Sequence, residues 1–212
     1  MLLVCISDLH GNLRGIERIN FSPDLLIVAG DITNFGRERE AESILKQLLK
    51  ITDKILVVPG NCDYPEVSKV LDELEINLWC RGKIIDRTGF FGVGGSNPTP
   101  FNTPLEYSEE EIKACLNEGF TKVKEAEIKI LVSHPPPYNT KVDRISSGLY
   151  VGSRAIREFI EKTQPSLVLC GHIHEARGID KIKNTIIVNP GPLHRGYARV
   201  EIDRGEIKVE VV

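Results

Sequence analysis

The stretch LLVCISDLH (residues 2–10) joins a short apolar run to a carboxylate and an imidazole, and this arrangement recurs along the chain. Runs rich in Ile, Leu and Val occupy Leu2–Ile6, Leu25–Ala29, Ile55–Val58, Ile128–Val132, Leu167–Leu169 and Thr185–Val188. Continuous apolar runs of this length, without polar alternation, are typical of strands buried on both faces. The sequence therefore predicts strands that are covered by other elements on each side.

Helical patterns separate several of these runs. Apolar residues recur at helical spacing in Arg37–Lys50, Pro65–Leu74, Ser108–Glu118 and Arg154–Lys162. Ser153 is the expected N-cap of the last helix. Alternating strands and helices imply βαβ units with right-handed crossovers.

Another set of segments, joined in pairs by turns, suits antiparallel pairing: Lys83–Asp86, Gly89–Val93, Ala198–Asp203 and Glu206–Val211. We therefore expect a mixed-sheet α/β protein in which two sheets pack face to face. No repeat, low-complexity tract or linker interrupts the pattern, so residues 1–212 are predicted to form one domain.

Composition narrows the functional class. The 212 residues include 27 Lys+Arg and 30 Asp+Glu, and a net charge of -3 argues against nucleic-acid binding through bulk charge. No apolar run approaches the roughly 18 residues of a membrane span, and no signal peptide is evident, so a cytoplasmic location without membrane association is expected. Five scattered cysteines without a CxxC motif are expected to be reduced thiols.

Polar side chains follow five of the predicted strands at the point where each strand ends. The carboxyl ends of strands in open α/β sheets are where ligands bind, and four of the five histidines fall there. The donors found at these ends, all oxygen or nitrogen, are Asp8, His10, Asp31, Asn61, His134, His172 and His174.

These donors suit a pair of metal ions. In an extended chain, His172 and His174 would point to the same side, and a shared metal explains two imidazoles aimed together. Mixed carboxylate, amide and imidazole ligands suit Mn, Fe, Zn or Ni. Two divalent ions with two aspartates leave a charge of about +2, which attracts and polarises phosphate and ionises a bridging water near neutral pH.

The ordered pattern DxH…GD…GN…H…GHxH, which extends from Asp8 to His174, resembles that of the calcineurin-like metallophosphoesterase superfamily. The resemblance covers nearly the whole chain and implies a four-layer αββα sandwich with two mixed β-sheets. It also implies the ligand roles: Asp8, His10 and His174 hold one ion, Asn61, His134 and His172 hold the other, and Asp31 bridges them.

Cys62 departs from the family pattern, because most members have a histidine directly after the asparagine. The Gly-Asn-Cys-Asp motif at residues 60–63 resembles an Icc-related branch of small bacterial and archaeal phosphoesterases, as does the stretch 94–101. A thiol is a weaker hydrogen-bond donor than imidazole, so Cys62 is either a modest aid to the leaving group or a small residue that fills the space.

The predicted activity is that of a dinuclear-metal phosphoesterase, in which a hydroxide held between the ions attacks phosphorus. Asp31, Asn61 and Cys62 are its candidate catalytic residues. Manganese is the first choice of metal, with Fe, Ni, Zn and Mg as alternatives. Small phosphodiesters, including cyclic or short nucleotides, are the favoured substrates and long nucleic acid is disfavoured; the oligomeric state stays open.

Other readings compete with this activity. They are a phosphomonoesterase, a non-catalytic metal-binding scaffold like the retromer subunit of this fold, a nuclease, and a structural zinc site at Cys170, His172 and His174. The long loops Ser96–Tyr107 and Pro135–Gly152 are expected to overhang the metals. The candidate substrate contacts, each with a solvated surface role as the alternative, are Asn12, Asn97, Lys141 and Arg144; Asn189 is a candidate for orienting a ligand histidine, and His194 is placed on the surface or the rim.

Overall fold

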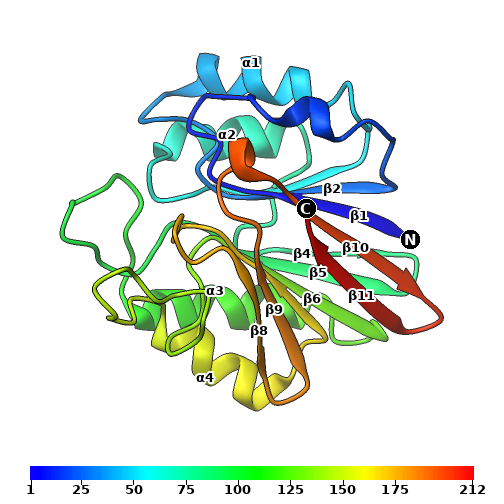
Figure 1. The fold of residues 1–212 in the computed structure, drawn as a ribbon, viewed down its shortest axis with the longest axis vertical. Helices are drawn as coiled ribbons and strands as arrows, with labels where there is room; N and C mark the ends of the chain where they lie inside the picture. Colours follow the sequence, from blue (N-terminus) through cyan, green and yellow to red (C-terminus); the bar gives the residue numbers. More distant parts are fainter.

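In the computed structural model, which describes residues 1–212, two mixed β-sheets pack face to face between two pairs of helices (Figure 1). The first sheet has the order β11-β10-β1-β2-β3. Its parallel strands β1 (Leu2–Ile6), β2 (Leu25–Ala29) and β3 (Ile55–Val58) are extended by the antiparallel hairpin of β10 (Ala198–Asp203) and β11 (Glu206–Val211). These bounds match the apolar runs and the turn-linked pair that the sequence predicts.

The second sheet has the order β4-β5-β6-β7-β9-β8. Its central strands are parallel: β5 (Thr88–Val93), β6 (Ile128–Ser133), β7 (Leu167–Leu169) and β9 (Thr185–Asn189). At the edges, β4 (Gly82–Ile85) and β8 (Gly178–Ile182) pair antiparallel. The antiparallel pairing of β4 with β5 is confirmed, although β5 also pairs with β6 in parallel.

Helices cover the outer face of each sheet. On the first sheet lie α1 (Glu38–Leu48) and α2 (Pro65–Glu73), and on the second lie α3 (Glu109–Thr121) and α4 (Arg154–Thr163) (Figure 1). Short 3-10 turns occupy Ile16–Arg18 and Leu193–Arg195. The expected four-layer αββα sandwich is therefore confirmed. None of its helices combines the length and the hydrophobicity that crossing a membrane requires.

Alternate residues of β1 show how the layers are held together. Val4 packs with α1 and α2, whereas Leu3 packs between the two sheets, and both side chains are fully buried. Successive side chains of a strand point to opposite faces, so a continuous apolar run serves two cores at once. Ser153 caps α4 as predicted, because its hydroxyl accepts a hydrogen bond from the Ile156 backbone N–H at 3.2 Å.

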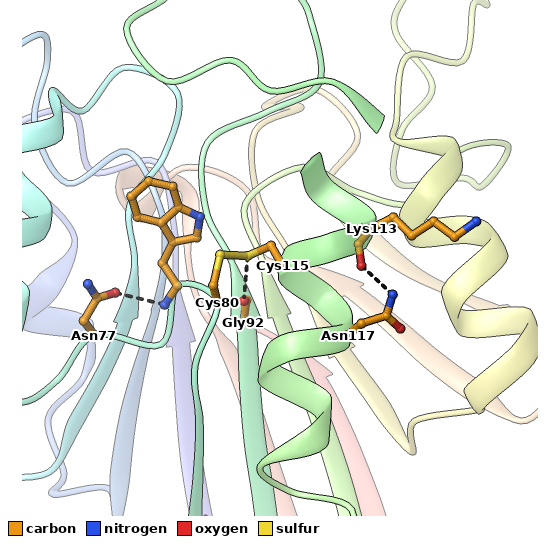
Figure 2. The surroundings of a disulfide bond; sticks show 7 residues. Asn77, Cys80, Gly92, Lys113, Cys115 and Asn117 are labelled. Carbon is orange, nitrogen blue, oxygen red and sulfur yellow. Dashed lines mark hydrogen bonds between the residues drawn. A yellow bond between two sulfur atoms is a disulfide. The ribbon is translucent and has the colours of Figure 1, made fainter. Parts of the chain in front are cut away.

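Two features of the fold were not expected from the sequence. Strand β8 was missed because its sequence, GIDKI, is interrupted by charges and its burial alternates, as an edge strand permits. The expectation of five reduced thiols is wrong for Cys80 and Cys115, which form a disulfide bond (Figure 2). Cys80 and Cys115 are 35 residues apart in sequence. The packing of α3 against β4 and β5 brings the Cα atoms of the two cysteines to 4.4 Å, a distance that a disulfide bond can span.

Candidate metal centre

The predicted donors meet where the strand ends of the two sheets come together. Asp8, Asp31 and Asn61 follow β1, β2 and β3 of the first sheet, and His134 and His172 follow β6 and β7 of the second. The two sheets are bridged directly, since His134 Nε2 lies 2.9 Å from Asn61 Oδ1. The position of the donors at one edge of both sheets follows from the parallel direction of these strands.

Asp8, His10 and His174, here termed the outer group, surround one point. His10 Nε2 and His174 Nε2 are 3.1 Å apart, and Asp8 Oδ1 lies 3.4 Å from His174 Nε2. Asp31 Oδ2 adds a fourth donor, 3.6 Å from His10 Nε2. Both histidines are open to solvent, because 26% of the His10 side chain and 45% of the His174 side chain are exposed.

Asn61, His134 and His172, here termed the inner group, lie deeper. The His134 side chain is fully buried, and its Nε2 faces Asn61 Oδ1 at 2.9 Å and Asp31 Oδ1 at 3.5 Å. Its Nδ1 lies 2.8 Å from the Ala29 carbonyl, which fixes the ring with Nε2 turned toward the site. The His172 ring packs against His134 with centroids 5.0 Å apart. Asp31 therefore stands between the outer and inner groups.

The backbone at the site adopts conformations that L-residues rarely use. Asp8, His10, Asp31 and His172 all have left-handed φ angles, of 52°, 47°, 49° and 69°. Each such residue costs on the order of 1 kcal/mol, so the surrounding structure must impose the conformation. A Cβ atom at Gly60 would overlap Asp31, which explains why glycine precedes the asparagine. The strand ends are thus bent to aim their side chains at the centre.

The left-handed turn at His172 corrects one sequence expectation. The chain from 172 to 174 is not extended, so the two imidazoles do not align as residues i and i+2 of a strand. His172 lies against His134, whereas His174 lies against His10, with ring centroids 5.0 Å apart in each pair. The two histidines consequently belong to different groups, as the family resemblance implies.

Asp31 and His134 form the electrostatic core of the site. Burial opposes ionisation of Asp31, but the neighbouring His134 outweighs it and holds the pKa of that carboxyl well below its usual range. Burial likewise opposes protonation of His134, yet the Asp31 carboxylate raises the pKa of the imidazole to about 9. Burial together with His134 lowers the pKa of His172 to about 4. In the metal-free protein, a proton on His134 therefore balances the buried carboxylate.

The arrangement fits divalent metal ions. Asp8, His10 and His174 form one candidate cluster, and Asp8, Asp31 and His134 form another, with ligand atoms in each within 4.8 Å of one another. The atoms that face one another in these clusters are imidazole nitrogens and carboxylate oxygens, which attract one another only through protons or a cation. A cation in each position would satisfy the buried carboxylates and leave the histidines neutral.

Cys62 contributes to the site through its backbone. Its N–H donates to Asp31 Oδ1 at 2.8 Å, so any residue but proline would keep that contact. Burial and the Asp31 carboxylate raise the pKa of the Cys62 thiol, so the side chain is a neutral thiol. The thiol sulfur nevertheless lies within reach of His10 and Asp31, at the edge of both groups.

Two residues that the sequence reasoning missed hold Asn61 in place. Asn61 Nδ2 donates to Thr103 Oγ1 at 3.0 Å, and Thr103 Oγ1 donates to Glu106 Oε1 at 2.6 Å. This chain turns the Asn61 carbonyl oxygen toward His134. Burial opposes ionisation of Glu106, but hydrogen bonds from Thr103 and Thr99 lower its pKa to about 2. The signal in the sequence was indirect: a ligand amide needs an acceptor for its N–H, and the loop 96–107 was expected to overhang the site.

The predicted substrate contacts fall in different places. Asn97 lines a cavity of about 600 Å³ that also includes His172 and His174, but its Nδ2 is engaged with the Val151 carbonyl at 3.1 Å. Lys141 and Arg144 line a neighbouring cavity of about 440 Å³, which none of the seven donors borders. Asn12 is exposed, and its Oδ1 accepts a hydrogen bond from its neighbour, the Arg14 backbone N–H.

The structure also locates Asn189, Cys170 and His194. Asn189 supports the loop that carries His172, because its Nδ2 donates to the Ile173 carbonyl at 2.9 Å. Cys170 does not join the histidines: its buried thiol lies 3.3 Å from the Val188 carbonyl, so the structural zinc site is contradicted. His194 is exposed on the 3-10 turn of residues 193–195.

Known proteins resemble this chain in sequence and in fold. An uncharacterized protein of Methanocaldococcus jannaschii is 45% identical over 199 residues, which cover 91% of this chain and 88% of the relative. A probable glycerophosphodiester phosphodiesterase of Arcobacter nitrofigilis is 24% identical, with 100% and 85% covered. The crystal structure of TT1561 of Thermus thermophilus superposes with a TM-score of 0.77 at 20% identity, covering 99% of this chain and 97% of that one.

The match to a protein family covers the whole candidate centre. Residues 1–176 match the calcineurin-like phosphoesterases, and this range contains each of the seven predicted donors, from Asp8 to His174. The two mixed sheets agree with that match. The chain therefore belongs to the calcineurin-like phosphoesterase family.

Proposed function

We propose that the protein is a two-metal phosphoesterase that hydrolyses small phosphodiesters. The observation that carries the proposal is the convergence of seven donors into two adjoining groups with Asp31 between them. One metal ion would not need seven donors divided between an outer and an inner group. Membership of the phosphoesterase family supports the same conclusion.

Each residue has a definite task in this proposal. When bound, two divalent ions activate water and neutralise charge on the phosphate. Asp31 contributes one oxygen to each group, and Asn61 and His134 hold the inner position rigidly. In the reaction, the oxygen of water bonds to phosphorus, the bond from phosphorus to the ester oxygen breaks, and the alcohol leaves with a proton. No protein nucleophile is required, because water supplies the oxygen that attacks phosphorus.

Diesters are favoured over monoesters for two reasons. A diester carries a single negative charge and needs less neutralisation than a monoester dianion. The Gly-Asn-Cys-Asp motif also supports placing the chain in the Icc-related branch, and a relative that matches the full chain is named as a probable glycerophosphodiester phosphodiesterase. Cyclic and short nucleotides belong to this substrate class. Manganese is the proposed metal, because the mixed nitrogen and oxygen donors suit it.

A paired assay tests the proposal. The protein is stripped with a chelator, reconstituted with Mn²⁺, and assayed on p-nitrophenyl phosphate and bis(p-nitrophenyl) phosphate, which release the same alcohol. We expect hydrolysis only after reconstitution, with the diester preferred. Turnover that survives complete chelation would contradict the two-metal mechanism, whereas a preference for the monoester would change the substrate class alone. Metal binding without turnover of either ester would favour the scaffold.

A further inference from the structure

A cavity of about 600 Å³ adjoins the metal centre at His172 and His174. This volume lies within the roughly 300–1,000 Å³ of ordinary small-molecule sites. Its apolar lining comes mainly from two loops, with Phe101 on the loop 96–107 and Ile145 and Val151 on the loop 135–152, and Ile173 adds to it from between the two histidines. The loops predicted to overhang the metals therefore share one cavity beside them.

Phe101 has the most exposed of the large apolar side chains, at 80%. Its loop is nevertheless well braced. Thr99 and Thr103 each donate a backbone N–H and a hydroxyl hydrogen bond to the Glu106 carboxylate, at 2.6 to 3.0 Å. Prolines at 98 and 100 restrict the backbone further. The ring of Phe101 is thus an exposed apolar surface on an already ordered loop. A ligand that binds to it loses little free energy to ordering the loop.

The second loop is tied to both the first loop and the metal centre. Asn97 donates to the Val151 carbonyl at 3.1 Å, and the Ser146 backbone N–H donates to Glu175 Oε1 at 2.7 Å. Glu175 directly follows His174, so Ile145 is held at a constant position relative to the outer group. The cavity is thus formed before any ligand binds.

The charged residues that line the cavity, Glu175 and Arg195, both lie next to His174 of the outer group. Arg195 lies beside His174, where its Nη1 donates to the His174 carbonyl at 3.2 Å, and this position suits a phosphate oxygen. The basic side chains Lys141, Arg144 and Arg177 line the neighbouring cavity instead. The Phe101 side of the cavity therefore suits an uncharged group.

We propose that this cavity is the subsite for the organic group of the phosphate ester, and that it selects an uncharged group of aromatic-ring size packed against Phe101, Ile145 and Val151. The inference rests on the proposed function, because the phosphate must lie at the metal centre for its substituent to reach the cavity. It assigns substrate selection to apolar side chains of both loops rather than to Lys141 or Arg144.

Binding of two phosphonates tests the inference without turnover. Phenylphosphonate and methylphosphonate have similar charge and differ in the organic group, and each is titrated calorimetrically into the Mn²⁺-loaded protein. An aromatic contact of this kind is worth about five- to tenfold in affinity, so phenylphosphonate should bind tighter by that factor. Phe101→Ala should abolish the preference, and Ile145→Ala should reduce it. Leu149→Ala should keep it, since Leu149 is 63% exposed on the same loop as Ile145 but does not line the cavity.

The outcomes separate the inference from the proposed function. Equal affinity for the two phosphonates, or a preference that survives Phe101→Ala, overturns the inference even if bis(p-nitrophenyl) phosphate is still hydrolysed. Failure to bind either phosphonate and to hydrolyse any ester overturns both. A preference lost in Phe101→Ala and retained in Leu149→Ala supports the aromatic subsite, whatever the rate of hydrolysis.

Discussion

The outer and inner groups use the same kinds of side chain in opposite surroundings. In the outer group, His174 exposes 45% of its side chain, whereas His134 of the inner group exposes 0%. Hydrogen bonds also fix two side chains of the inner group: His134 Nδ1 is paired with the Ala29 carbonyl, and Asn61 Nδ2 donates to Thr103 Oγ1. An ion in the inner position should therefore be held more firmly, and an ion in the outer position should exchange more readily and meet the substrate.

Asp31 turns one carboxylate oxygen toward His10 of the outer group and the other toward His134 of the inner group, so its loss should have the largest effect. Asp31→Asn removes the buried negative charge that would balance both ions, and we expect bound metal to fall from two ions per chain to none or one. Because even indirect partners of a metal site cost about 10- to 100-fold, turnover should fall by more than about a hundredfold.

Metal content by mass spectrometry and diester turnover measure this effect together. Asp203→Asn, a change at an exposed residue at the end of β10, is the matched control and should leave both unchanged. Two ions per chain in Asp31→Asn would show that the groups bind metal independently.

The inner group should also respond strongly to pH. His134 has a pKa raised to about 9 by Asp31, so a proton must leave before its Nε2 can bind a metal. His172 is neutral at these pH values, because its pKa is lowered to about 4. Below pH 9, each unit of rising pH should therefore strengthen inner-site affinity about tenfold, or about thirtyfold between pH 6.5 and pH 8.

Calorimetry in His174→Ala isolates this effect, because that variant leaves all three inner residues in place. Proton release during Mn²⁺ binding should accompany the rising affinity. An affinity that stays constant over this pH range would contradict the displacement of a proton from His134 by the inner ion.

The hydrogen bond between Asn61 and Thr103 predicts a smaller effect, a loss of affinity for the inner ion alone. Thr103→Val keeps the side-chain shape but removes the acceptor for Asn61 Nδ2, so the amide is free to turn its oxygen away. We expect about a tenfold loss of inner-ion affinity, with the outer ion unaffected. Thr99→Val is the matched control, because it also removes a hydrogen bond to Glu106 without touching Asn61. Equal losses in the two variants would assign the effect to the loop rather than to Asn61.

Cys62 should give the smallest effect, since any replacement but proline keeps the backbone N–H that donates to Asp31 Oδ1. Cys62→His introduces an imidazole that can donate a proton, and we expect turnover to rise several-fold for alkyl esters and less for activated aryl esters, whose alcohols leave without help. The ratio of kcat/KM for methyl and p-nitrophenyl leaving groups measures this. An equal rise for both, or none, would show that the position does not assist the leaving group.

The sequence was most informative where one physical pattern dominates. Buried parallel strands such as Leu25–Ala29 require continuous apolar runs, so their positions were readable to the residue. The polar residues after those runs also pointed to one edge of the sheets, where the structure brings the donors together. The family resemblance added the division into two groups, which spacing alone did not reveal.

Features that depend on tertiary packing could not be predicted from the sequence. The bond between Cys80 and Cys115 forms because α3 packs on the second sheet, and no local motif marks it. Thr103 and Glu106 act on Asn61 across a distance of more than 40 residues, and ordinary loop composition conceals that role. The turn at His172 reverses the extended geometry expected of a strand end, because the left-handed φ is imposed by the surrounding structure.

Diffraction from crystals soaked in Mn²⁺, recorded at the manganese absorption edge, tests the central claim most directly. Two anomalous peaks should appear, one among Asp8, His10, His174 and Asp31, and one among Asn61, His134, His172 and Asp31. A single peak, or peaks that do not touch Asp31, would contradict a pair of ions joined through that carboxylate.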